Sequence, residues 1–157
     1  MYAPTLGTLL RRLIEALDGA VEQSYVDAGL DYRPRYTPVV RALLDQGPMT
    51  IRALSRCTGV THSAMGQTVN EMAAHGLASL TVGEDARERI VALTPYAENI
   101  CPQLQRLWAT TEAAARTLDD ELGLSLPGVI EQTLKLLNET PFSDRLRRAA
   151  SSSSALQ

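Results

Sequence analysis

Residues 50–76 contain the feature that most restricts the fold of this chain. The stretch TIRALSRCTGVTHSAMGQTVNEMAAHG consists of two short amphipathic segments separated by a glycine turn at 58–60. In the second segment Met65, Val69 and Met72 recur at helical spacing, which predicts one buried apolar face. Two short helices joined by a turn of this kind are typical of a helix-turn-helix.

The other face of the second helix is polar and carries no cation. No Lys or Arg occurs between Arg56 and Arg87. Gln and Asn side chains can each form paired hydrogen bonds with adenine, and Ser can address several base edges. Such a helix could therefore read bases with amides and hydroxyls. The alternative is that these are ordinary solvated side chains. We expect Thr61 to open the helix and its exposed residues to be His62, Ser63, Gly66, Gln67 and Asn70.

The periodicity of the flanking sequence predicts more helices and one hairpin. A long first helix is expected to end near Gly29, and a connector over 31–38 leads to a short helix. Alternating apolar residues at 77–82 and 90–93 predict two strands around a polar loop. A long helix should start at Pro95, with Thr94 as its N-cap, and a last helix should cover about 127–138. The fold class is therefore mainly α with a small β-hairpin (α+β).

Apolar stripes on the terminal helices exceed what the small middle part can cover. One runs from Leu6 to Tyr25 and another from Ile100 to Leu122. We expect these helices to pack on each other and on a second copy of the chain, giving a homodimer.

Charge gives only modest support for a nucleic-acid partner. The 157-residue chain has a formal net charge of −3, so no global basic field surrounds it. Residues 33–94 nevertheless contain seven Arg and five acidic residues, which makes this segment net positive. Phosphate contacts are expected from Arg52, Arg56, Arg87 and Arg89.

The middle of the chain resembles the MarR family of bacterial winged-helix regulators over about residues 29–97. The most specific part is DARERIVALTP, in which Asp85 and Arg87 precede VALTP. The resemblance implies a winged helix-turn-helix in which Asp85 braces Arg87 and Arg87 reaches into the minor groove. An alternative is that Arg87 only pairs with Asp85 or Glu88 on a solvated loop.

The resemblance also implies homodimers assembled from the terminal helices. The expected parts are a dimerisation helix (1–30), a winged helix-turn-helix (31–95), C-terminal dimerisation helices (96–148) and a disordered tail (149–157).

The same resemblance implies a ligand crevice between the dimerisation helices and the winged helix. Tyr25, Tyr36 and Trp108 are expected near it, and Arg12 could pair with the carboxylate of a small aromatic ligand. The alternative is that these rings fill the core of a chain in which aromatic residues are scarce.

Other functional classes find little support. Cys57 is expected to fill the core rather than sense redox state, and Cys57, His62 and His75 do not have a metal-binding spacing. No catalytic motif or cofactor motif occurs, so an enzyme is not expected. Neither a signal peptide nor a membrane span is expected, and two cysteines without a disulfide framework favour the cytoplasm.

The expected function is a homodimeric transcriptional regulator, a repressor that binds a pseudo-palindromic double-stranded operator and is released by a small ligand. The alternative is a degenerate winged-helix dimer that acts as a protein-interaction or ligand-sensing module without strong DNA binding.

Overall fold

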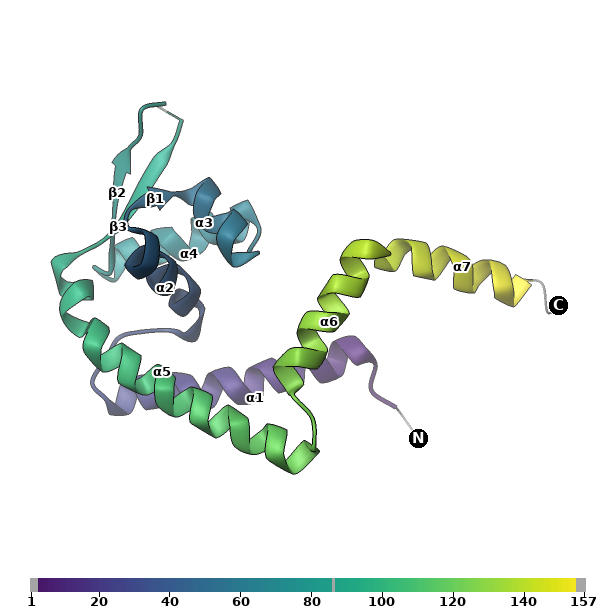
Figure 1. Ribbon diagram of the computed structural model, residues 1–157. Helices are drawn as coiled ribbons and strands as arrows, with labels where there is room; N and C mark the ends of the chain where they lie inside the picture. The colour runs from purple at the N-terminus through teal and green to yellow at the C-terminus, as the bar shows by residue number, and fades with distance from the viewer. Residues whose placement is uncertain (1–2, 86, 155–157) are drawn as a thin grey trace. The chain divides into compact units, whose positions relative to one another are not determined.

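A computed structural model describes residues 3–85 and 87–154. It is mainly helical with a small antiparallel sheet, as the sequence predicts (Figure 1). The chain divides into two compact units, residues 1–109 and 110–157, and the long helix α5 crosses from one to the other. The functional parts expected from the sequence, with boundaries at 30, 95 and 148, remain predictions.

The first unit contains the N-terminal helix, the helix-turn-helix and the hairpin. Its elements are α1 (Leu6–Asp27), η1 (Pro34–Tyr36), α2 (Thr37–Gln46), β1 (Met49–Thr50), α3 (Ile51–Thr58), α4 (His62–Ala74), β2 (Ala78–Val82), β3 (Arg89–Leu93) and the first half of α5 (Pro95–Leu122).

Threonine side chains start the helices at the positions that the sequence indicates. Thr50 Oγ1 accepts a hydrogen bond from Ala53 N at 3.1 Å, and Thr94 Oγ1 accepts one from Ala97 N at 3.1 Å. Each bond satisfies one of the backbone N–H groups that a helix leaves unpaired in its first turn. The predicted N-cap role of Thr94 is therefore confirmed.

The sheet has three strands in the order β1-β3-β2, all antiparallel. Val91, in the central strand, pairs with Leu80 on one side and Met49 on the other. The sequence predicts only β2 and β3. Strand β1 has two residues and exists through its pairing with a strand some forty residues away, so no local pattern indicates it.

Three tyrosines contribute to the hydrophobic core of the first unit, together with aliphatic side chains. Tyr25 from α1, Tyr32 from the connector and Tyr36 from η1 are all buried. The rings of Tyr25 and Tyr32 lie 4.8 Å apart edge to face, and those of Tyr32 and Tyr36 lie 5.6 Å apart edge to face. Such pairs add to the stabilisation that burial alone gives. They fix the end of α1 against the winged helix.

The second unit consists of the end of α5, α6 (Leu126–Glu139) and α7 (Phe142–Ser154). Helix α6 buries none of its residues, although it carries a row of apolar side chains. The Arg145 side chain donates to the carbonyl oxygens of Thr140 and Leu136, both at 3.1 Å, and so links the start of α7 to the end of α6.

Helix α7 differs from the tail that the sequence predicts. Disorder was expected from residue 149, but α7 continues through Ser154; residues 155–157 lie outside the described part. Within this serine run the Ser151 and Ser152 hydroxyls donate to carbonyls one turn earlier, those of Arg147 and Arg148.

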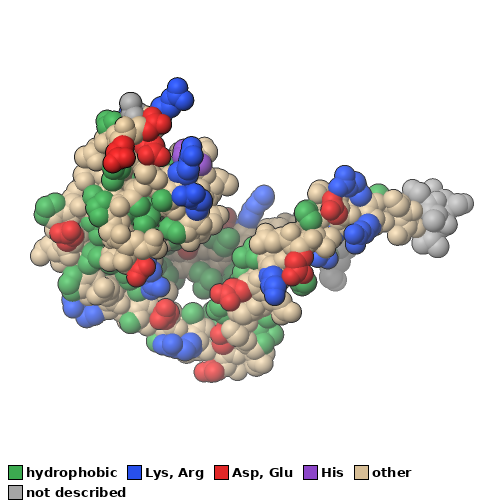
Figure 2. All heavy atoms as spheres, turned by 45° about the horizontal axis from the view of Figure 1, so that its top comes forward, with side chains coloured by type: hydrophobic (Ala, Val, Ile, Leu, Met, Phe, Trp, Pro, Cys, Tyr) green, Lys and Arg blue, Asp and Glu red, His purple; other side chains and the backbone are tan. Residues whose placement is uncertain are grey.

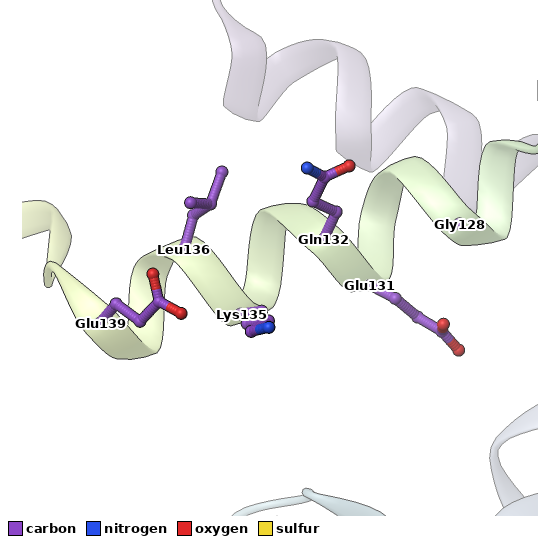
Figure 3. A pocket seen from close by; sticks show the side chains of 6 residues that line it. All are labelled: Gly128, Glu131, Gln132, Lys135, Leu136 and Glu139. Atoms are coloured by element: carbon purple, nitrogen blue, oxygen red, sulfur yellow. The ribbon is translucent and has the colours of Figure 1, made fainter.

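A shallow hollow of about 520 Å³ lies along one side of α6 (Figure 3). All of its lining residues come from this single helix, and Glu131 points away from the side on which Gln132 and Leu136 lie. No group of converging side chains makes it a binding site. It is lined by Gly128, Glu131, Gln132, Lys135, Leu136 and Glu139.

Candidate nucleic-acid interface

Helix α4 presents the polar face that the sequence predicts. Thr61 Oγ1 accepts from Ala64 N at 3.3 Å and so starts the helix. Met65, Val69 and Met72 are fully buried, which confirms the predicted apolar face. The exposed side chains on the other side include Ser63, Gln67 and Asn70, spaced so that they share one face, and His62 lies exposed at the first turn.

Helix α3 contributes two cations beside this face. Arg52 and Arg56 are both exposed, and their spacing of four residues places them one turn apart on the same side of α3. The turn between α3 and α4 is held by Ser55 Oγ, which donates to the Val60 carbonyl at 2.7 Å. Gly59 allows the turn because its φ of 72° lies in the left-handed region. Figure 2 shows Arg side chains, in blue, beside a purple His side chain on the upper part of the first unit.

Cys57 corrects a prediction. The sequence pattern places it in the core, but the structure exposes it. Helix α3 has eight residues, and Leu54 is its only fully buried side chain. The buried apolar stripe therefore does not extend to Cys57. Cys101 is the buried cysteine; desolvation, with the nearby Glu98 carboxylate, raises the pKa of its thiol.

The wing is a hairpin whose tip is ordered by Asp85. Its carboxylate oxygen Oδ1 accepts a hydrogen bond from the backbone N–H of Arg87 at 2.9 Å. The Asp85 carbonyl accepts from Glu88 N at 2.8 Å, and Gly83 N donates to the Glu88 carbonyl at 3.1 Å. Asp85 thus holds the backbone of the tip, which leaves the Arg87 side chain exposed. Ala86 lies outside the described residues.

The loop end of the hairpin carries another candidate cation, next to the tip. Arg89 is exposed at the start of β3, and its Nη1 donates to the Glu88 carbonyl at 3.2 Å. Acidic side chains gather at the same end of the hairpin, as Figure 2 also shows. The wing is therefore a place of mixed charge and not a uniformly basic surface.

Arginines of the net positive segment also form ion pairs with α4. Arg33 and Arg35 both form ion pairs with Glu71 on α4. Sequence reasoning missed this arrangement because the partners lie more than thirty-five positions apart and no spacing rule connects them.

The residues expected to form a ligand crevice do not converge within one chain. Tyr25 and Tyr36 lie in the core, and Arg12 is exposed on α1. Arg12 precedes Tyr25 by thirteen helical residues, which separates them by roughly 20 Å along the axis. Burial is the first cause that raises the pKa of the Tyr36 hydroxyl, as it also does for Tyr32.

Trp108 alone of this group lines a hollow. The hollow has a volume of about 350 Å³, and the guanidinium carbon of Arg41 lies 4.8 Å from the centre of the Trp108 ring. The Trp108 Nε1 atom is buried and has no hydrogen-bond partner among the described residues. The lining residues are Arg41, Leu44, Asp45, Gln105 and Trp108.

Within the described residues, no helix is long and apolar enough to cross a membrane. In the same part of the chain, no group of three or more His, Cys, Asp or Glu side chains is placed to hold a metal ion.

Comparison with known proteins relates part of this chain to a known family. Residues 29–88 match the sequence model of the MarR family. No curated protein matches the sequence. Solved structures share its fold at low identity. MOSR, a transcriptional regulator of M. tuberculosis solved in complex with DNA, is 20% identical with a TM-score of 0.68, covering 85% of this chain and 93% of that one.

Two further structures agree. PcaV of Streptomyces coelicolor, solved with its natural ligand, is 21% identical with a TM-score of 0.61 and covers 98% of this chain and 99% of its own. A mutant MarR from E. coli, complexed with operator DNA, is 19% identical with a TM-score of 0.58 and covers 87% and 94%. Residues 29–88 thus match the MarR-family sequence model, and the chain shares the winged-helix fold of these solved structures.

Proposed function

We propose that this chain is a homodimeric DNA-binding transcriptional regulator, a repressor that leaves a pseudo-palindromic operator when a small ligand binds. The observation that carries the proposal is the exposed row of Ser63, Gln67 and Asn70 on α4. These side chains can donate to and accept from base edges in the major groove. MOSR and the MarR mutant, which share the fold, were solved with DNA.

Charge for phosphate contacts is proposed to come from beside the reading helix. Arg52 and Arg56 on α3 and Arg87 on the wing are exposed, and Arg89 lies next to the tip of the wing, where β3 begins. Contacts of this kind fix the position of a protein on DNA without reading sequence. The roles of Thr61 and His62 are proposed to be contacts at the first turn of α4.

The dimer is proposed to form through the apolar faces of the terminal helices. Leu9 and Leu10 on α1 and Leu134 on α6 leave about half of their side-chain surface in solvent. Apolar rows of this length on single helices are typical of surfaces that a partner covers.

The sharpest test replaces one reading residue. The wild-type chain is used to select its preferred duplex from a randomised library, and Gln67→Ala is compared on that duplex. We expect a loss of roughly 1–3 kcal/mol and relaxed preference at one base position. Ala64→Ser, which adds a hydroxyl on the flank of the same helix, is the control and should keep the wild-type preference. An unchanged preference in Gln67→Ala rejects the reading role.

The ligand is proposed to occupy the hollow beside Trp108. Arg41 supplies a cation beside the Trp108 ring, and a cation next to an aromatic ring suits an aromatic carboxylate. PcaV was solved with its natural ligand, which supports ligand binding in this fold. Trp108 is the only tryptophan of the chain, so benzoate titration followed by its fluorescence tests the site directly. Unchanged fluorescence at millimolar benzoate contradicts it.

A competing function is a dimeric protein-interaction module. The absence of Lys and Arg on α4 favours it, because recognition helices commonly use such side chains for affinity. Failure of the wild-type chain to enrich any duplex from the library at low salt would support this function.

A further inference from the structure

A series of four alternating charges connects α1 with α4. Arg33 Nη1 lies 3.4 Å from Glu22 Oε1 on α1, and Arg33 Nε lies 3.3 Å from Glu71 Oε1 on α4. Arg35 Nη2 contacts the other oxygen of Glu71. Arg33 is therefore shared between the N-terminal helix and the reading helix.

Part of the Arg33 guanidinium is buried beside Glu71. Its Nε is buried and has no well-aligned hydrogen bond among the described residues, so the nearby carboxylate is what offsets the cost of burying it. Desolvation acts to raise the pKa of Glu71, but the Arg35 hydrogen bond and both guanidinium charges hold that pKa below its ordinary value. Glu71 stays ionised and available to both arginines.

Glu71 also lies where it can control the orientation of the reading face. It follows Asn70 directly and comes one turn after Gln67. One turn later still, His75 Nδ1 lies 2.6 Å from Asp31 Oδ2. Residues 71 and 75 share one flank of α4, so this flank contacts the 31–35 connector twice. Two such contacts restrain rotation of α4 about its own axis.

We propose that Arg33 is a positioning residue that couples α1 to α4, and so sets the angle at which Ser63, Gln67 and Asn70 meet the bases. The inference rests on the proposed DNA function. Hydrogen bonds to base edges weaken steeply with misalignment, so a small rotation of α4 affects reading more than it affects folding. Through Glu22, a displacement of α1 is transmitted to the same residue.

Measurements of folding stability alone cannot reveal a positioning role for Arg33. The side chains of Arg33 and Glu22 are 42% and 44% exposed, and ion pairs this exposed contribute little to folding. The informative quantity is specificity, the ratio of affinity for the selected duplex to affinity for a random-sequence duplex of equal length.

Arg33→Gln and Arg35→Gln form a matched pair of variants. Each removes one positive charge from the same connector, so both should weaken binding to the random duplex equally. Only Arg33→Gln breaks the connection between α1 and α4. We expect it to lower the specificity ratio about fivefold, and Arg35→Gln to lower it less than about twofold, with melting temperatures close to wild type. Equal specificity ratios in the two variants overturn the proposal.

A double-mutant cycle tests the connection to α1. Glu22 does not contact DNA-reading residues directly, so independent sites would give additive effects. We expect Glu22→Gln to lower the specificity ratio about threefold in the wild-type chain and to have no further effect in Arg33→Gln. The same loss in both backgrounds overturns the coupling.

Hydrogen exchange separates failure of the inference from failure of the DNA function. If the wild-type chain enriches no duplex, the DNA function fails, but the bridge can still be measured at the amides of 71–75. Faster exchange there in Glu22→Gln supports the connection between α1 and α4. Unchanged exchange overturns it.

Discussion

The winged-helix unit and helix α6 use apolar side chains in opposite ways. Within the described residues, the fully buried hydrophobic core runs from Tyr25 to Trp108 and lies in the first unit. Helix α6 has a comparable apolar row, yet Ile130 is 41% and Leu134 56% exposed. The winged helix buries its own hydrophobic side chains, whereas α6, like much of α1, leaves apolar side chains in solvent. The difference indicates that the winged helix folds around its own core, while the proposed dimer would use the terminal helices.

The largest expected effect comes from placing a charge on the apolar row of α6. If a second copy covers this row, Leu134→Asp buries an unpaired carboxylate, which costs about 3–5 kcal/mol. Sedimentation of the wild-type chain should give about twice the 17.1 kDa chain mass, and the variant should sediment as a monomer.

Gln132→Asp is the matched control for that variant. It adds the same charge on the opposite side of α6 and should leave the dimer intact. A wild-type chain that sediments as a monomer at micromolar concentration would contradict the proposed dimer.

A buried residue of the winged-helix unit should behave differently. Met72 is fully buried, and Met72→Ala should lower the free energy of unfolding by about 2–5 kcal/mol through lost burial and the cavity left behind. Because this core lies within one unit, the loss should not depend on protein concentration. In contrast, the loss in Leu134→Ala should grow as the protein is diluted, since it acts through association. Thermal melts at two concentrations measure both, and a concentration-dependent loss in Met72→Ala contradicts the comparison.

A smaller effect is expected on acidification. The folded-state pKa of Glu71 is lower than its ordinary value, because the Arg35 and Arg33 contacts outweigh desolvation. Its contribution to stability is therefore present above the ordinary carboxyl pKa and is lost as the pH falls through the folded-state pKa. Glu71→Gln should show a flatter fall in melting temperature as the pH falls from about 5 to about 3, through and below the ordinary carboxyl pKa. Parallel curves for variant and wild type contradict the assignment.

Local signals in the sequence predicted most of the helices and the two long strands. Thr61 and Thr94 act as caps through hydrogen bonds that span three residues, so their effect is encoded within one turn. The buried face of Met65, Val69 and Met72 follows from helical spacing alone.

The errors concern features that depend on distant partners. Strand β1 exists through pairing with β3, and the exposure of Cys57 depends on how α3 sits on the rest of the core. The ion pairs of Glu71 with Arg33 and Arg35 join segments that are far apart in sequence. The candidate reading residues could be placed on the exposed side of α4 from periodicity, but their neighbours could not.

We expect a reading helix without cations to depend on the wing for the positive charge that contacts DNA phosphates. Asp85 orders the backbone of the wing tip and leaves the Arg87 side chain exposed. With few cations per subunit, few counterions are released on binding, at a slope of about 0.9 per neutralised phosphate. Losing Arg87 from both subunits should therefore remove a large share of the affinity.

The most direct measurement is binding of wild type and Arg87→Ala to the selected duplex near physiological salt. Lys135→Ala, which removes one charge from α6, serves as the control. The account predicts that Arg87→Ala loses detectable binding with an unchanged melting temperature, whereas Lys135→Ala binds like wild type. Full binding by Arg87→Ala would contradict it.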